Sequence, residues 1–380
     1  MPKDIYMEQK ILLKDLLFNK VKIERIAGEI YHVHSSFKKN EFVSDVITKF
    51  PQLELKARIA WIAECLKKHL PSDYKLAVGT LIKALPKSNN PELSDDDFGD
   101  FIYAPYAEYV AKNGCTKKYL QFSLNALYEI TQRFSAEDAI RFFINTFPNE
   151  TLKELKIWTK DSHYHVRRLC SEGTRPKLPW SQKINIPVSV PLPILTNLYS
   201  DKTRYVTRSV ANHLNDISKS NPDLVIETLS KWRKSGKQKP QEMEYIVHHS
   251  LRTLVKNGDK RAMQMLGFSP DIRVSVSKFL VPTEVKMNTV LEFSFEIQCE
   301  EDAVILIDYI LYFQNKAGKL NGKKVFKLAK LSLGKDKSIQ VSKRHMFREQ
   351  MTTRTFYAGK HEVEIQVNGK PLARKSFLLK

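Results

Sequence analysis

The sequence has few cysteines and no long hydrophobic run. Its four cysteines, Cys65, Cys115, Cys170 and Cys299, are far apart and fit neither zinc-ligand spacing nor a disulfide framework. This usage favours a reducing compartment, so we expect a cytoplasmic protein. No apolar run is long enough to cross a bilayer, and the first residues, MPKDIYMEQK, lack the apolar core of a signal peptide. We therefore expect no membrane partner.

The sequence also lacks the short motifs of several enzyme classes. We find no Walker loop, no Rossmann glycine pattern and no Gly-x-Ser-x-Gly elbow. Asp161, His163 and His165 alternate in the manner of metal ligands. However, no further ligand cluster accompanies them, and Asp161 or Ser162 is a natural helix N-cap. We expect neither a metal site nor a cofactor.

Basic residues far outnumber acidic ones. Lys plus Arg is 62 against 42 for Asp plus Glu, which gives a net charge of +20. Such an excess favours a polyanionic partner, most simply nucleic acid, although a merely soluble basic protein has the same composition. From residue 271 onward there are 20 basic and 12 acidic residues, hence +8, which leaves +12 for residues 1–270. Both parts can therefore face the same polyanion.

Residues 1–266 form a succession of helical patterns. Apolar residues recur at three- and four-residue spacing over 13–30, 53–70 and 119–134. The breaks carry Pro, Asn, Ser and Gly, as in LPKSNNPELSDDD at 85–97. These patterns predict an α-helical domain.

A repeat appears within this helical part. YHVRRLCSEG (164–173) aligns with RYVTRSVANH (204–213) at an offset of 40, so that Arg168 matches Arg208. A period near 40 built from helix pairs is typical of HEAT-like repeats, which stack into a curved solenoid with a concave binding surface. We predict a HEAT-like repeat domain over residues 1–268.

The pattern changes after Gly267-Phe268-Ser269-Pro270. Short runs rich in Val, Ile and Phe follow, many of them alternating with polar residues. Asn368-Gly369 lies between two such runs and is a strong hairpin signal. We predict an immunoglobulin-like β-sandwich over residues 271–380. The expected fold is multidomain, with an α-helical HEAT-like repeat solenoid followed by this sandwich.

The first helix of the repeat pair ends in opposite charges. Arg168 and Glu172 are four residues apart, so they share a helix face, and Gly173 fits the C-cap. Because Arg208 matches Arg168, the two arginines either bind DNA or serve repeat packing. The counterpart of Glu172 is Asn212, so packing does not by itself demand a carboxylate there. A carboxylate on an anion-seeking surface works against binding, and catalysis is one reason to keep it.

Two basic segments carry a tryptophan. In TRPKLPW (174–180), two prolines limit flexibility, Arg175 and Lys177 can donate to phosphates, and Trp180 can stack on a sugar or base. KWRKSGKQK (231–239) is predicted to be a basic loop between helices. Each segment is either a DNA contact or an ordinary surface loop.

A second carboxylate lies in RFSAEDAIRFF (133–143), which opens a helix. We predict a capping box between Ser135 and Asp138, which leaves Glu137 unengaged in the first turn. The alternative role for Glu137 is to complement the helix dipole.

These segments resemble the AlkC family of DNA alkylation-repair glycosylases, relatives of AlkD within the HEAT-like repeat superfamily. The resemblance is carried by SEGTRPKLPW (171–180), VRRL (166–169), RFSAEDAIRFFI (133–144), LKDLLFN (13–19), LELKARI (53–59) and VTRSVANHLNDISKSNPD (206–223). The C-terminal part resembles the immunoglobulin-like domain of many members. The sequence departs from the family pattern at Cys170, Lys177, Asp138 and Phe142.

The resemblance implies an enzyme of base excision repair that removes cationic alkylated bases, notably 3-methyladenine and 3-methylcytosine type lesions, without deep base flipping. It implies that Glu137 and Glu172 are the active-site carboxylates, and that Arg168, Arg175 and Trp180 contact DNA around the lesion. It also implies a double-stranded DNA partner, and we expect a monomer.

The alternative is a non-catalytic HEAT-repeat scaffold that binds nucleic acid or protein, since a fold does not fix a function. The two carboxylates separate these hypotheses, because a protein that only binds gains nothing from them. If Glu137 and Glu172 lie on opposite sides of the molecule, the scaffold hypothesis is favoured.

Overall fold

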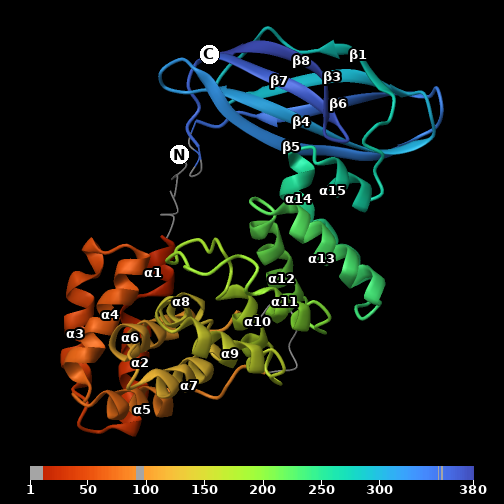
Figure 1. Ribbon diagram of the computed structural model, residues 1–380. Helices are drawn as coiled ribbons and strands as arrows, with labels where there is room; N and C mark the ends of the chain where they lie inside the picture. The colour runs from red at the N-terminus through yellow and green to blue at the C-terminus, as the bar shows by residue number, and fades with distance from the viewer. Residues whose placement is uncertain (1–11, 91–97, 350, 352–353) are drawn as a thin grey trace, which may run out of the picture. The chain divides into compact units, whose positions relative to one another are not determined.

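The protein is described by a computed structural model that covers residues 12–90, 98–349, 351 and 354–380 (Figure 1). The chain divides into two compact units. The first comprises Met1–Ile217 with Lys231–Ile246, and the second comprises Ser218–Ser230 with Val247–Lys380.

The predicted order of helices followed by strands is confirmed. The described helices are α1 (Leu13–Leu17), α2 (Lys20–Val33), α3 (Lys39–Lys49), α4 (Leu55–His69), α5 (Tyr74–Ala84), α6 (Ala104–Gly114), α7 (Leu120–Thr131), α8 (Glu137–Thr146), α9 (Pro148–Trp158), α10 (Tyr164–Glu172), α11 (Leu192–Leu198), α12 (Arg204–Ile217), α13 (Pro222–Ser235), α14 (Pro240–Lys256) and α15 (Lys260–Met265). Helix gives way to strand between Met265 and Val274. The proposed domain boundary at 268–271 falls within this interval.

The apolar spacing over residues 13–30 produces two helices, α1 and α2. Asn19 separates them, because its side chain accepts a hydrogen bond from the backbone N–H of Lys22 at 3.1 Å and so caps α2. Of the predicted break at 85–97, residues 91–97 lie outside the described part of the chain.

The 40-residue repeat corresponds to two packed helices, α10 and α12 (Figure 1). They begin at Tyr164 and Arg204, and each follows another helix, α9 or α11. Their apolar residues are fully buried, for example Val166 on α10 and Val206 on α12.

The sandwich consists of two sheets. Its strands are β1 (Val274–Leu280), β2 (Glu284–Val285), β3 (Val290–Cys299), β4 (Ala303–Gln314), β5 (Leu320–Leu333), β6 (Ser338–Met346), β7 (Gly359–Val367) and β8 (Lys370–Leu379). The sheet orders are β1-β3-β6 and β2-β8-β7-β4-β5. All pairs are antiparallel except β2 with β8. Buried Phe, Ile, Leu and Val side chains from both sheets form one core.

The predicted hairpin at Asn368-Gly369 joins β7 to β8. Both residues have positive φ angles, 43° and 79°, as a type I′ turn requires. The turn also fixes the end of the helical part within the second unit. The Asn368 side chain donates to the carbonyl of Ser269 at 2.8 Å, and a Cβ atom at Gly258 would lie 2.6 Å from the carbonyl oxygen of Gly369.

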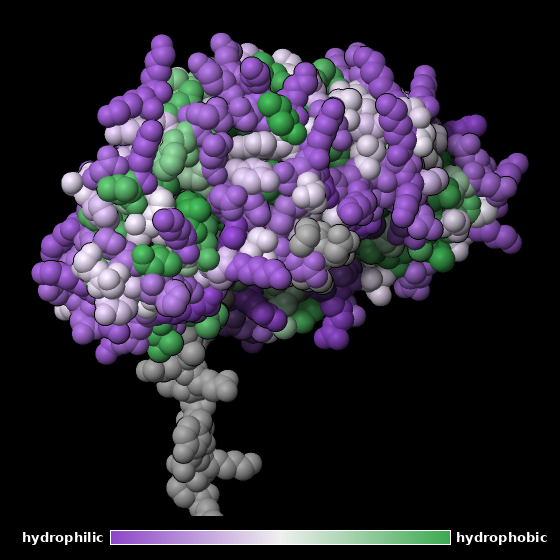
Figure 2. All heavy atoms as spheres, turned by 90° about the horizontal axis from the view of Figure 1, so that it is seen from below, coloured by the Kyte–Doolittle hydropathy of each residue, from purple (hydrophilic) through white to green (hydrophobic). Residues whose placement is uncertain are grey.

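The face seen in Figure 2 is mainly hydrophilic, with hydrophobic side chains in small separate patches. Among the described residues, no helix is both long enough and apolar enough to cross a membrane.

Candidate active site

Both predicted carboxylates contact the same guanidinium group. Glu137 is the first residue of α8, whereas Arg168 and Glu172 lie one turn apart on α10. Arg168 Nη1 is 2.7 Å from Glu137 Oε2, and its Nη2 is 3.6 Å from Glu172 Oε2. The structure therefore brings together two acidic residues that are 35 positions apart in the sequence, and it excludes their lying on opposite sides of the molecule.

The ionic contacts continue beyond Glu172. Its Oε1 lies 2.5 Å from Nη1 of Arg175, and its Oε2 accepts a hydrogen bond from the Ser209 hydroxyl at 2.6 Å. Arg175 in turn lies 2.8 Å from Oδ2 of Asp216. We call the resulting set the carboxylate–guanidinium cluster; its members are Glu137, Arg168, Glu172, Arg175 and Asp216.

The two glutamates differ in their exposure to solvent. The side chain of Glu172 is 5% exposed, whereas that of Glu137 is 28% exposed. Burial alone would raise the pKa of Glu172, but Arg168, Arg175 and the Ser209 hydroxyl outweigh it, and the pKa is lowered. Glu172 is therefore ionised at neutral pH.

Arg168 remains charged for the reciprocal reason. Burial lowers the pKa of a guanidinium, but the charges of Glu137 and Glu172 outweigh this effect, and the pKa of Arg168 is raised. Its guanidinium carbon also lies 4.6 Å from the ring centroid of Tyr205, a cation–π contact. Arg168 is thus held on three sides and cannot titrate in the physiological range.

The predicted capping box is wrong. The N-cap of α8 is Ala136, which makes no side-chain hydrogen bond. Ser135 instead donates to Glu137 Oε2 at 2.8 Å, while Asp138 pairs with Lys56 from α4 at 2.8 Å. The arginine on α10 explains the difference, because it fixes the Glu137 carboxylate and recruits the Ser135 hydroxyl. Glu137 is therefore engaged rather than free in the first turn.

Gly173 ends α10, as predicted, but the reason is steric. Its φ is −63°, so no left-handed conformation is needed, whereas a Cβ atom there would lie 2.5 Å from a methyl carbon of Ile140. Next to this close approach, the fully buried Arg141 donates to the carbonyls of Gly173, Arg175 and Gln182 at 3.1, 2.8 and 2.6 Å. Helix α8 thereby holds the loop that follows α10.

The remaining predicted DNA contacts lie on this loop and on α12. Lys177 and Trp180 are exposed, and Trp180 is 83% exposed with a positive φ of 74°. Arg208 lies half-buried on α12, one repeat after Arg168. Arg175 does not point freely into solvent, because it pairs with two carboxylates of the cluster.

Three participants were missed in the sequence: Tyr205, Ser209 and His213. They lie four residues apart on α12, so they share the face that meets α10. His213 is buried, and its Nδ1 donates to the carbonyl of Ser171 at 3.1 Å. Burial and the charge of Arg175 lower the pKa of His213 to about 4, so it is neutral. The four-residue spacing was the signal that could have identified them.

The alternating residues at 161–165 serve the start of α10. His163 is the N-cap, because its Nδ1 accepts from the backbone N–H of His165, so the N-cap predicted at Asp161 or Ser162 is wrong. Asp161 instead accepts from the backbone N–H of His163 and from the hydroxyl of Tyr128. Among the described residues, no group of three His, Cys, Asp or Glu side chains could hold a metal ion.

The basic segment at 231–239 is not a loop throughout. Helix α13 continues to Ser235, and Trp232 is buried and stacks on Tyr199 with ring centroids 4.4 Å apart. Trp232 therefore belongs to the helical core, and the prediction that it is a loop residue is wrong.

Known proteins resemble the chain over most of its length. Residues 275–380 match the family described as "Uncharacterised protein YhaZ, C-terminal Ig-like domain". The "Uncharacterized protein YhaZ" of Bacillus subtilis is 32% identical over 355 residues, which is 91% of this chain and 94% of that protein. The Pseudomonas fluorescens alkylpurine DNA glycosylase AlkC, bound to DNA containing an abasic site analog, is 30% identical with a TM-score of 0.87, over 97% of this chain and 100% of that one. The chain, with its helical part followed by an immunoglobulin-like domain, therefore belongs to the AlkC family.

Proposed function

We propose that the protein is a DNA glycosylase that excises cationic N-alkylated bases, of the 3-methyladenine and 3-methylcytosine type, from double-stranded DNA. The observation that carries the proposal is the sharing of Arg168 by Glu137 and Glu172 in a protein of net charge +20. A protein that only bound DNA would be weakened by a partly exposed carboxylate such as Glu137, because it repels phosphate. The similarity to a DNA-bound alkylpurine DNA glycosylase supports the same activity.

The chemistry matches the charge of the cluster. An N-alkylated base is already cationic, so cleavage of the C1′–N bond returns the bonding electrons to the base, which leaves as a neutral molecule. Positive oxocarbenium charge then develops on the sugar, and nearby carboxylates stabilise it. Water adds to C1′ and loses a proton, which leaves an abasic site. Because the lesion brings its own charge, the enzyme needs neither a strong acid nor a deep pocket for the base.

Exposure suggests different roles for the two carboxylates. Glu137, at 28% exposed, is the one that a bound sugar meets first. Direct contact with Glu172, at 5% exposed, requires that Arg168 or Arg175 be displaced. In our proposal Glu137 therefore faces the sugar, and Glu172 provides a fixed negative charge that also orients the two arginines.

The surrounding cations hold the DNA backbone. Lys177 and Trp180 are exposed on the loop after α10 and are available to phosphate and to stacking contacts. Arg168, Arg175 and Arg208 complete the proposed DNA-binding set. Stability alone does not explain the presence of Arg168 and Arg175, because a buried ion-pair network is seldom more stable than apolar packing.

The direct test is to incubate the protein with methylated duplex DNA and identify the released bases by mass. We expect free 3-methyladenine with the wild-type protein and little with Glu137→Gln or Glu172→Gln. Binding of the DNA without release of any base would favour the scaffold alternative.

A further inference from the structure

Lys56 on α4 connects the active-site helix to the exposed loop. Its Nζ lies 2.8 Å from Oδ2 of Asp138 and donates a hydrogen bond to the carbonyl oxygen of Trp180. The Lys56 side chain is 49% exposed, so the link lies at the surface and not in the core. One amine therefore joins three segments that are far apart in the sequence.

Trp180 occupies an unfavourable position in its turn. The backbone N–H of Ser181 donates to the carbonyl of Leu178 at 3.3 Å, with Pro179 and Trp180 as the central residues. Proline in the second place and a φ of 74° in the third identify a type II turn. The third place of such a turn favours glycine, because a side chain with a positive φ is strained, and more so when it is bulky.

Burial does not offset this strain. At 83% exposed, the Trp180 side chain contributes little to the hydrophobic core. The turn must therefore be held by contacts of its backbone. Arg141 holds the carbonyls on either side of the turn, at Arg175 and Gln182, and Lys56 holds the carbonyl of Trp180 itself.

We infer that Lys56 and Asp138 position Trp180 for contact with the DNA around the lesion. Asp138 follows Glu137 directly in the first turn of α8, so the turn that carries the active-site carboxylate also anchors the aromatic side chain. Lys56 is a positioning residue that acts through Trp180. The inference rests on the proposed function, because it assumes that Trp180 meets the substrate.

The kinetic test uses single-turnover excision from a duplex with one 3-methylcytosine. Lys56→Met is expected to lower the rate about tenfold, because small misplacements of a substrate-positioning group reduce the rate by factors up to roughly a hundred. Lys56→Arg should retain most activity, and Asp138→Asn should lose less than Lys56→Met. The matched control is Lys38→Met, which removes a lysine from another exposed ion pair, with Glu41, and should excise at the wild-type rate.

A second background separates positioning from direct DNA contact by Lys56. In Trp180→Ala, the added Lys56→Met change should have no further effect, since there is no aromatic side chain left to position. An equal loss in both backgrounds would overturn the inference, as would a wild-type rate for Lys56→Met.

A spectroscopic readout does not depend on excision. Trp158 and Trp232 are buried, so in a Trp61→Phe background the part of the fluorescence that acrylamide removes comes mainly from Trp180. Lys56→Met should lower the fluorescence anisotropy of Trp180 while the melting temperature stays unchanged. If the wild-type protein excises nothing, the proposed function fails, yet the anisotropy still decides whether Lys56 holds the turn; an unchanged anisotropy would rule that out.

Discussion

The substitution Glu172→Gln isolates the charge at the centre of the cluster. Glutamine keeps the size of the side chain and an oxygen that can accept from Ser209, but it removes the negative charge between Arg168 and Arg175. Breaking a buried ion pair commonly costs about 3–5 kcal/mol because it leaves a charge without a partner. Here Arg168 keeps Glu137 and Arg175 keeps Asp216, so we expect a smaller loss, about 1–3 kcal/mol.

The effect on excision should be larger than the effect on folding. A preorganised group that stabilises developing charge is worth roughly 10²–10³ in rate when it is removed. We therefore expect single-turnover excision to fall by roughly 10²–10³, while affinity for duplex DNA is kept or slightly increased because one negative charge is lost. The assay combines single-turnover excision, fluorescence anisotropy of labelled duplex and thermal unfolding.

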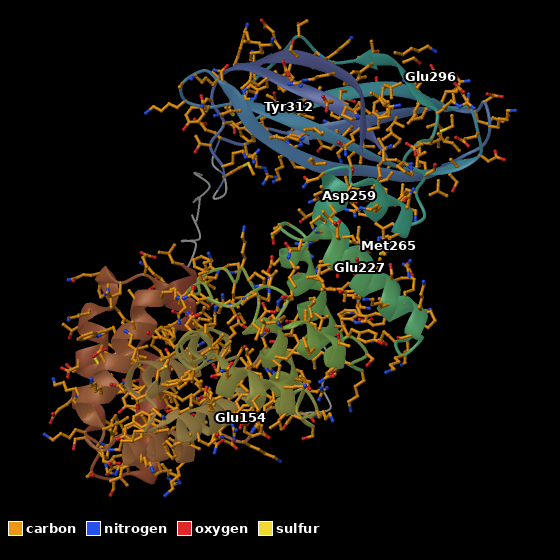
Figure 3. All side chains as sticks on the ribbon, in the orientation of Figure 1. Glu154, Glu227, Asp259, Met265, Glu296 and Tyr312 are labelled. Carbon is orange, nitrogen blue, oxygen red and sulfur yellow. The ribbon has the colours of Figure 1, made fainter. Side chains whose placement is uncertain are left out.

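The matched control is Glu154→Gln, which makes the same change of charge at a residue of α9 (Figure 3) that is not a member of the cluster. It should excise, bind and unfold as the wild-type protein does. A folded Glu172→Gln protein that excises at the wild-type rate would refute the role of the carboxylate. Loss of DNA binding in parallel with excision would show that the residue serves the DNA interface instead.

Three further predictions follow from charge and burial. The pKa of His213 is near 6.5 in the unfolded chain and about 4 in the folded protein, so the unfolded state binds more protons between these values. Stability should therefore fall by about 3 kcal/mol as the pH drops through this window. His213→Gln should flatten the curve of melting temperature against pH. An equally steep acid limb in the variant would contradict this. Asp308 on β4 is buried, and burial raises its pKa to about 6, although the positive charges of Lys327 and Lys256 favour the ionised form. The folded state therefore binds this proton more tightly than the unfolded state does, and the resulting stabilisation is lost as the pH rises through 6. Asp308→Asn should therefore stabilise the second unit by up to about 3 kcal/mol at pH 8 but not at pH 4, and a lower melting temperature at pH 8 would contradict it. Lys177→Ala should reduce the slope of log affinity against log salt for undamaged duplex by about 0.9, whereas an unchanged slope would exclude a phosphate contact.

Local patterns predicted the elements of this fold well. Helical spacing, the 40-residue repeat and the Asn368-Gly369 hairpin each depend on residues that are close in sequence. Glu172 also stood out locally, because Asn212 in the equivalent position showed that packing does not require a carboxylate. These features could be read from the sequence because short-range geometry determines them.

The partners of the site residues were not predictable in this way. Ser135 has the spacing of a capping residue, but Arg168, 33 positions away, donates to its hydroxyl, which in turn donates to Glu137. Lys56 reaches the carbonyl of Trp180 across 124 positions, and no local pattern indicates such a contact. Trp232 looked like a loop residue because the basic residues around it hid the helical face that packs on Tyr199.

The central claim is that two carboxylates in one cluster support the departure of a positively charged base. It is tested most directly by single-turnover excision from two duplexes that differ only in the position of one methyl group, with either cationic 3-methylcytosine or neutral 5-methylcytosine. We predict that the wild-type protein releases 3-methylcytosine and retains 5-methylcytosine, and that Glu137→Gln with Glu172→Gln abolishes the release. Equal release of both bases, or tight binding of both duplexes with release of neither, would contradict the account.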